Sequence, residues 1–263
     1  ALPILGAILA VVMGFDIISK ERQDRTLKTL LSHPIYRDEI INGKAIGGML
    51  TIIVAIGITF AICIAMLLLS DIVPTINEFI SIGLFGILSI IMLVSYFSIA
   101  LMSSVLFKNS GFSIVFTLGL IFVIGLILPL IGLFASELII GPAPEMPEWD
   151  PVEFEESIDY IPIEPVVDEE FEEWRREMDE HWSRTMAVTE AFAILDPGTH
   201  FGRISTELGI GMDIGMMMGE EPVEDPDIFD KLGAVWMNIL ALFVIPTIFF
   251  AIAYTKFMKL DIR

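Results

Sequence analysis

The chain has 263 residues, of which 55% are hydrophobic, and its formal net charge is −20 at pH 7. Soluble domains contain about 45–50% apolar residues even when glycine is counted, so the composition excludes an ordinary soluble domain. With this charge we expect no nucleic-acid partner. The single cysteine, Cys63, excludes a disulfide within the chain.

Five long apolar runs are the main feature of the sequence. Each reaches or exceeds the length of about 18 residues that indicates a membrane-spanning helix, whereas strands of a membrane barrel alternate over about ten residues. The runs cover residues 1–18, 45–70, 79–107, 112–135 and 232–255. We therefore predict an all-α membrane protein, a polytopic bundle of transmembrane helices with five spans visible. The chain begins at Ala1 without a methionine, and we expect one further span before it, six in the intact protein.

A polar loop, residues 19–44, separates the first two apolar runs. We expect a helix from about Glu21 to Ser32, because Pro34 disfavours helical geometry in the residue before it. This helix carries a short apolar stripe at three- and four-residue steps, made of Leu27, Leu30 and Leu31. A second helix is expected to start around Arg37 and to continue into the next span.

Glycine and proline mark two further features of the spans. Gly43 and Gly47 stand four residues apart on one helix face, where small residues allow another helix to approach closely. That helix belongs either to the same chain or to a second copy. Pro129 is expected to kink the span 112–135, because proline removes one backbone hydrogen bond of the helix.

The segment 136–230 holds 27 of the 35 acidic residues and four of the 15 basic ones. We predict that it forms one acidic domain between a membrane part at 1–135 and a last span with its tail at 231–263. A helix is expected from Asp168. One semi-apolar face of it consists of Phe171, Trp174, Met178, Trp182, Thr185, Met186 and Thr189. The sequence LDPGT should end this helix near Asp196.

Basic residues indicate the side of the membrane on which each loop lies. Lysine and arginine in short loops mark the cytoplasmic face. Ten of them gather in the loop 19–44, the turn at Lys108 and the C-terminal tail, which fall on one side if each apolar run crosses once. We therefore expect a cytoplasmic C-terminus and an acidic domain on the extracytoplasmic side.

No catalytic constellation is evident in the sequence. The histidines are scattered, and neither HExxH nor GxSxG occurs. The sequence DEIINGKA lacks both the first glycine and the final Ser or Thr of a phosphate loop, so we do not expect ATP binding by that motif. EF-hand spacing is absent too, and the acidic clusters are expected to form a solvated surface rather than a metal site. His200 is expected to pack or to cap a short helix.

The sequence ERQDRTLKTLLSHPIYRDEIINGKAIGG resembles the cytoplasmic loop of ABC type-2 permeases, the membrane subunits of ATP-binding-cassette exporters. The family pattern runs Glu, Gly-Thr-Leu, a Leu pair, Pro, Arg and Gly-Lys. The residues that match it are Glu21, Thr26, Leu27, Leu30, Leu31, Pro34, Arg37, Gly43 and Lys44. Arg25 stands where the family has glycine, and we expect this departure to alter the local turn. The similarity extends to FAILDPGTHFGRIS and to the basic tail FMKLDIR.

The resemblance implies a permease subunit that exports a substrate across a prokaryotic plasma membrane. In that family the loop carries a coupling helix that rests in a groove of a separate ATP-binding subunit, and two permeases assemble with two such subunits. The residues implied to bind the ATP-binding subunit are Glu21, Arg25, Thr26, Leu27, Leu30, Leu31, Pro34 and Arg37, with the leucines as apolar anchor. The chain itself is expected to be no enzyme and to hold no cofactor, because ATP and Mg would bind the partner.

Two alternatives stay open at this stage. The helix of the loop could lie on the lipid headgroups instead of docking on a protein. The chain could also be a membrane receptor or assembly protein that binds a partner through its acidic extracytoplasmic domain. The spans carry no interior charges, which favours an apolar or amphipathic cargo over a small ion for a transporter.

Overall fold

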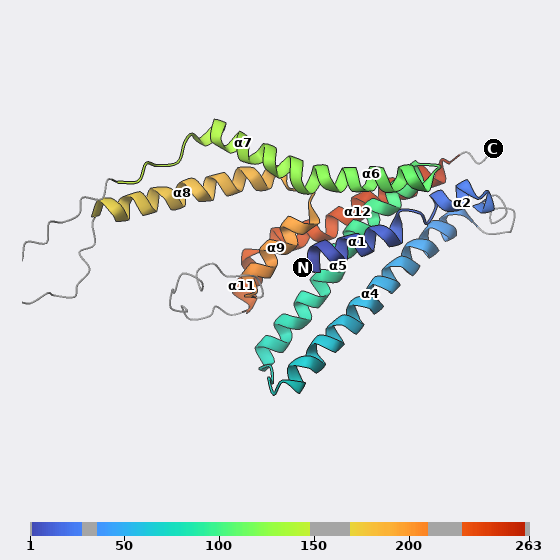
Figure 1. The fold of residues 1–263 in the computed structure, drawn as a ribbon, viewed down its shortest axis with the longest axis horizontal. Coiled ribbons are helices and arrows are strands. Elements are labelled where there is room, and N and C mark those ends of the chain that lie inside the picture. The colour runs from blue at the N-terminus through green and yellow to red at the C-terminus, as the bar shows by residue number, and fades with distance from the viewer. Residues whose placement is uncertain (1, 28–35, 148–168, 210–227, 261–263) are drawn as a thin grey trace, which may run out of the picture. The chain divides into compact units, whose positions relative to one another are not determined.

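The computed structural model describes residues 2–27, 36–147, 169–209 and 228–260, and every regular element within these ranges is a helix. In chain order (Figure 1) the elements are α1 (Leu2–Gly14), α2 (Ser19–Gln23), α4 (Arg37–Leu69), α5 (Ile76–Leu106), α6 (Ser110–Phe122), the π-helix η1 (Val123–Ile127), α7 (Leu128–Ile140), α8 (Glu169–Phe192), α9 (Pro197–Glu207), α11 (Ile228–Ala234) and α12 (Trp236–Met258). The prediction of an all-α fold is confirmed.

Four helical stretches among the described residues are long and apolar enough to cross a membrane. They are Arg37–Leu69, Glu78–Leu106, Ser110–Ile140 and Trp236–Met258, which coincide with the last four predicted spans. The chain is therefore a multi-pass membrane protein. The first predicted span, 1–18, contains α1, whose 13 residues fall short of the about 18 needed to cross. A fifth span there, and a sixth before it, stay predictions.

The chain forms two compact units, Ala1–Gly125 with Ile194–Arg263, and Leu126–Ala193. In the first unit α5 is the central helix, because α1, α4, α9 and α12 all pack against it. The most apolar window of α5 is 61% buried, against 6% for α4. The predicted acidic domain at 136–230 stays a prediction, since 148–168 and 210–227 lie outside the described residues.

Small residues allow the neighbouring helices to approach α5 closely. A Cβ on Gly14 of α1 would lie 2.7 Å from the Cβ of Ala100, and a Cβ on Gly48 of α4 would overlap the ring of Phe97. The hydroxyls of the buried serines donate to the carbonyl four residues earlier in α5, as in Ser89, Ser95, Ser98 and Ser103. These serines therefore add no unsatisfied polar group to the apolar core.

The candidate span Ser110–Ile140 changes its helix type in the middle. The π-helix η1 (Val123–Ile127) follows α6 directly and ends two residues before Pro129. Proline has no N–H to donate to the carbonyl of Gly125, so the α-helical pattern cannot continue through this turn. Wider turns of this kind relieve such an interruption without ending the helix. The irregularity expected at Pro129 takes this form.

In the second unit, α7 and α8 pack side by side and run in opposite directions. A Cβ on Gly132 would lie 3.0 Å from the Cα of Thr189, near the end of α8. At the other end, His181 Nε2 lies 3.1 Å from the carbonyl oxygen of Gly141, and the indole N–H of Trp174 donates to the carbonyl oxygen of Pro144 at 3.3 Å. The unit is thus a helical hairpin.

The predicted apolar face of α8 is partly wrong. Trp182 is 52% exposed and Met186 is 46% exposed, although the prediction placed both on the semi-apolar face. Thr185 of the predicted face is buried, and Trp174 of the same face donates to the carbonyl oxygen of Pro144. The covered side also includes His181, whose contact with the carbonyl oxygen of Gly141 residue apolarity does not reveal.

Candidate functional site

The polar loop begins with the short helix α2, which is fixed to α5 at its first turn. The hydroxyl of Ser104 in α5 accepts the backbone N–H of Ile18 at 2.9 Å and that of Ser19 at 3.0 Å. Ser104 is fully buried and lies more than 80 positions away from both in the sequence. Two of the N–H groups that a helix start leaves unpaired are therefore satisfied by the central helix.

Arg25 ends α2 in a left-handed backbone conformation, with a φ of 59°. It follows the C-cap residue Asp24, a place where glycine is common because glycine adopts this conformation without steric cost. Arginine thus stands at a turn whose geometry suits glycine, the residue that the resemblance implied at this position. The predicted helix from about Glu21 to Ser32 is interrupted at this point: α2 ends at Gln23, Thr26 and Leu27 are helical again, and 28–32 lie outside the described residues.

Arg22 ties α2 to the last turn of α5. Its Nη1 donates to the carbonyl oxygen of Val105 at 3.0 Å and to that of Phe107 at 3.4 Å. These carbonyls lie at the C-terminal end of α5, where helix carbonyls lack partners and carry partial negative charge. Burial lowers the pKa of the Arg22 guanidinium from its ordinary value, but arginine stays charged at neutral pH.

Arg37 makes a similar contact with the end of α12. Its Nη1 donates to the carbonyl oxygen of Leu260 at 2.7 Å and to that of Met258 at 3.4 Å. Arg37 is the first residue of α4, whose start is stabilised by Glu39 accepting the N–H of Tyr36 at 3.1 Å. The beginning of α4 and the end of α12 are thus held together across 223 sequence positions.

Lys44 closes the polar loop on itself. Its Nζ lies 2.7 Å from Oε1 of Glu21 and also donates to the carbonyl oxygen of Ile17 at 3.2 Å. Both side chains are about three-quarters covered, with 23% of Lys44 and 29% of Glu21 exposed. The second oxygen of Glu21 is buried without a hydrogen-bond partner among the described residues. Helix α4 is thereby joined to α2 and to the turn after α1.

The structure places the predicted partner-binding residues in different surroundings. Leu27 is 1% exposed and belongs to the core of the first unit, so its side chain is not on the surface. Thr26 is exposed and donates to the carbonyl oxygen of Glu21 at 3.3 Å. Arg25 is exposed, whereas Glu21 and Arg37 make the intrachain contacts described above. Leu30, Leu31 and Pro34 lie outside the described residues.

Gly43 and Gly47 lie on an exposed face of α4. A Cβ on either would meet no atom within 4 Å among the described residues. The close helix contact in this region belongs to Gly48, whose Cβ position is filled by the ring of Phe97. Packing of Gly43 and Gly47 against another helix stays a prediction, and the described part of the chain does not supply that helix.

The contacts made by Arg22 and Ser104 were not singled out from the sequence, and Lys44 was matched to the family pattern without an assigned contact. The sequence signal for these contacts is weak, because a basic residue that binds a distant helix end cannot be distinguished by sequence from any other basic residue of a loop. One clue was available: basic residues stabilise the carbonyl end of a helix. Arg22 and Arg37 do this for helices to which they do not themselves belong, and sequence spacing does not reveal such pairs.

A second polar cluster surrounds Asp196, the N-cap of α9. Its Oδ2 accepts the N–H of Thr199 at 2.9 Å and the Thr199 hydroxyl at 2.8 Å, and its Oδ1 accepts the N–H of Gly198 at 3.2 Å. The hydroxyl of Tyr96 in α5 donates to the same Oδ1 at 3.2 Å. The carboxylate is 7% exposed, and all these donors satisfy it, so the cluster fixes α9 to the central span.

His200 completes the attachment of α9. One ring nitrogen, Nδ1, lies 2.8 Å from Oδ1 of Asn238 in α12, and Nε2 lies 3.0 Å from the carbonyl oxygen of Ile194. The side chain is 8% exposed. Its neighbour Phe201 packs on Phe85 of α5, with ring centroids 5.1 Å apart. His200 therefore holds a structural position, which confirms the expectation that it packs.

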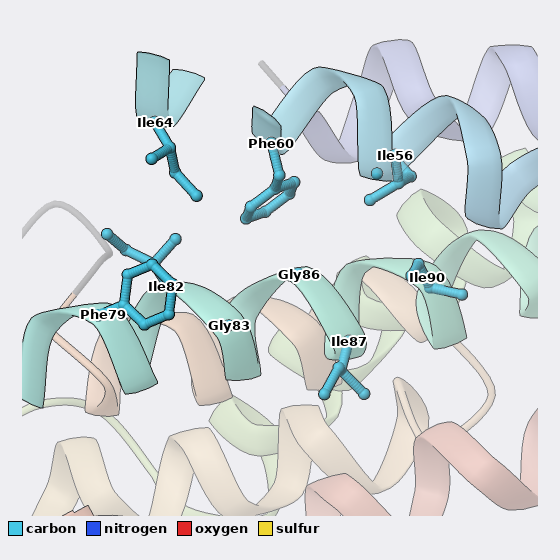
Figure 2. A pocket seen from close by; sticks show the side chains of 10 residues that line it. Ile56, Phe60, Ile64, Phe79, Ile82, Gly83, Gly86, Ile87 and Ile90 are labelled. Atoms are coloured by element: carbon cyan, nitrogen blue, oxygen red, sulfur yellow. The ribbon is translucent and has the colours of Figure 1, made fainter. Parts of the chain in front are cut away.

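The α4–α5 hairpin carries an apolar groove of about 240 Å³. Figure 2 shows Ile56 and Phe60 of α4 facing α5 across it. Glycines open the groove, because a Cβ on Gly57 or Gly83 would meet no described atom within 4 Å. The ten lining residues are isoleucine, phenylalanine and glycine, so the groove offers no hydrogen bond to a ligand.

The fold and the polar loop define a class: a helical multi-pass membrane protein whose helix ends are gathered around a basic loop. Within this class the sequence matches the family described as ABC-2 family transporter protein over residues 1–262. The chain belongs to that family, as the resemblance of the loop implied. A comparison with curated proteins found no match. The protein is thus a membrane component of an ABC transporter, and the family implies an ATP-binding partner.

Proposed function

We propose that the chain is the permease subunit of an ABC exporter, and that its polar loop docks on a separate ATP-binding subunit. Family membership over residues 1–262 supports the permease class. The observation that carries the coupling role is the attachment of the loop to helix ends. Arg22 and Arg37 bind the ends of α5 and α12, so the loop is rigidly linked to the spans.

The remaining parts of the assembly follow from the same proposal. The ATP and Mg sites belong to the partner, and this chain contributes no catalytic group. Two permease copies and two ATP-binding subunits form the complex in a prokaryotic plasma membrane. The loop 19–44 and the C-terminus lie in the cytoplasm, and the acidic α8 lies outside.

Co-purification tests the docking of the loop. The tagged chain is expressed together with its genomic neighbours, and the amount of ATP-binding subunit recovered is measured. Replacing both Leu30→Asp and Leu31→Asp should lower the recovery at least about tenfold, because charges at an apolar anchor cost about 2 kcal/mol or more of binding. The elution volume and the thermal unfolding of the permease should not change.

Lys20→Asp is the matched control, because Lys20 lies in the same loop and is exposed. This variant should recover the ATP-binding subunit within about twofold of the wild type, as expected for a rim charge. Unchanged recovery with the double leucine variant would remove the docking assignment. A wild-type chain that never recovers an ATP-binding subunit would overturn the exporter proposal and favour a receptor or assembly protein.

A further inference from the structure

Three cations of the polar loop meet the ends of helices at one end of the first unit. Arg22 binds the end of α5, Arg37 binds the end of α12, and Lys44 binds the turn after α1 and Glu21 of α2. Figure 1 shows α2, the first turn of α4 and the last turn of α12 at the same end of this unit. We name Arg22, Arg37 and Lys44 the cation clamps.

The clamps contact two helices that are not covalently adjacent to the polar loop. The loop connects α1 to α4, so any displacement of the loop would move α1 and α4 through the backbone. Arg22 and Arg37 add α5 and α12, which lie 83 and 223 positions away in the sequence. These two helices pack most extensively on each other within the unit. The clamps therefore connect the loop to the core of the unit.

The chemistry of the contacts suits a mechanical connection. Each of the three clamps donates a charge-assisted hydrogen bond to a backbone carbonyl, which is stronger than a bond between neutral groups. A backbone carbonyl moves with its helix, whereas a side-chain acceptor could rotate away. In each arginine a single guanidinium nitrogen, Nη1, donates to two carbonyl oxygens, at 3.0 and 3.4 Å in Arg22 and at 2.7 and 3.4 Å in Arg37.

We propose that Arg22 and Arg37 are positioning residues that transmit a displacement of the polar loop to α5 and α12. The ion pair of Lys44 and Glu21 joins α2 to α4, so that both sides of the loop move together. The inference rests on the proposed function, because the displacement comes from the ATP-binding subunit. It assigns to Arg37 and Glu21 a role inside the chain instead of one at the surface of the partner.

The test compares two fluorescent reporters. One lies on α12, which is attached to the loop through Arg37, and the other lies on α4, which is attached to the loop through the backbone. The native Cys63 is exposed on α4 and carries one fluorophore. In a second version, Cys63→Ser with Val244→Cys places the fluorophore on α12, at a position that is 43% exposed. The complex with the ATP-binding subunit is reconstituted in lipid nanodiscs, and the fluorescence change on adding Mg-ATP with orthovanadate is measured.

The double variant Arg22→Gln with Arg37→Gln should still recover the ATP-binding subunit within about twofold. Its ATP-dependent signal at Val244→Cys should fall about fivefold, because the charge-assisted hydrogen bonds that attach the loop to α5 and α12 are lost. The signal at Cys63 should stay within about twofold, because α4 is attached to the loop through the backbone. Arg22→Lys with Arg37→Lys should restore part of the signal, since lysine keeps the charge but has a shorter side chain than arginine.

Lys20→Gln is the control, as it removes an exposed cation of the same loop and should leave both signals unchanged. A full signal at Val244→Cys in the double glutamine variant would overturn the inference. Equal losses at both reporters would also overturn it, because the arginines would then only hold the fold. A wild-type complex without any ATP-dependent signal contradicts it as well. Failure of the wild-type chain to recover the subunit refutes the proposed function itself.

Discussion

At the scale of single residues, the polar loop is defined by what its charged side chains bind. Arg22 and Arg37 donate to backbone carbonyls, and Lys44 pairs with Glu21. Arg25 is different, because its most informative property is its backbone, which has a φ of 59°. A side chain in that conformation has its Cβ close to the next carbonyl oxygen, which costs about 1–2 kcal/mol.

Arg25→Gly is therefore expected to stabilise the end of α2. The gain should be about 1 kcal/mol or less, because glycine removes the strain but also increases the entropy of the unfolded chain. Hydrogen exchange of the amides in Ser19–Gln23 measures it, and the exchange should slow by a few-fold.

Asp24→Gly is the control for this prediction. Asp24 has a φ of −81°, which any residue adopts, so glycine relieves no strain there and should accelerate the exchange. Faster exchange in the Arg25→Gly variant as well would show that the arginine side chain contributes more than its backbone costs.

At the scale of elements, α9 depends on a single capping carboxylate. Asp196 is followed by Pro197 at the first helical position, a combination that starts a helix efficiently. The same carboxylate accepts the Tyr96 hydroxyl, so one side chain both starts α9 and attaches it to α5. The sequence showed that the spans carry no interior charge. It did not reveal that Asp196, which lies outside the spans, contacts α5.

Asp196→Ala should destabilise the protein by about 1–2 kcal/mol, because it removes both the cap and the carboxylate that accepts the Tyr96 hydroxyl. Asp196→Asn should lose much less, since asparagine caps helices about as well as aspartate. Thermal unfolding in detergent micelles compares the two variants. Equal losses in both would mean that the negative charge, and not the cap, stabilises α9.

The sequence was sufficient to predict elements with a strong local signal. The four candidate spans followed from their apolar runs, and the end of α8, which lies at Phe192, followed from LDPGT. The start of α4 at Arg37 was also predicted correctly. In each case the determinant lies within one short segment, as apolar length or as a proline that interrupts a helix.

The rest depended on contacts between distant residues. The end of α2 at Gln23 follows from a left-handed arginine, which residue preferences do not anticipate. The exposed Trp182 results from the way α8 meets α7. The clamps of Arg22 and Arg37 join residues 83 or more positions apart. Periodicity and spacing describe one segment at a time and so could not place these partners.

At the scale of the whole molecule, charge predicts the topology. The loop 19–44 is basic, and the acidic residues concentrate between 136 and 230. Lys20→Cys and Glu180→Cys, each with Cys63→Ser, test this with a membrane-impermeant maleimide. Glu180→Cys should react in intact cells, and Lys20→Cys should react only after permeabilisation, because basic loops stay in the cytoplasm.

Both positions suit the reaction, since Lys20 and Glu180 are exposed. Rapid labelling of Lys20→Cys in intact cells would reverse the predicted orientation. Labelling of both positions from the same side would contradict an odd number of crossings between them.

The buried serines of α5 have a consequence for movement within the first unit. The hydroxyls of Ser89, Ser95, Ser98 and Ser103 donate to carbonyls of α5 itself. Among the described residues the single side-chain hydrogen bond from α5 to α12 joins Ser95 to the carbonyl oxygen of Leu242, at the long distance of 3.5 Å. Along most of their length α5 and α12 therefore contact each other through the packing of apolar side chains. Such an interface permits shear, a small sliding of one helix along another that exchanges few hydrogen bonds.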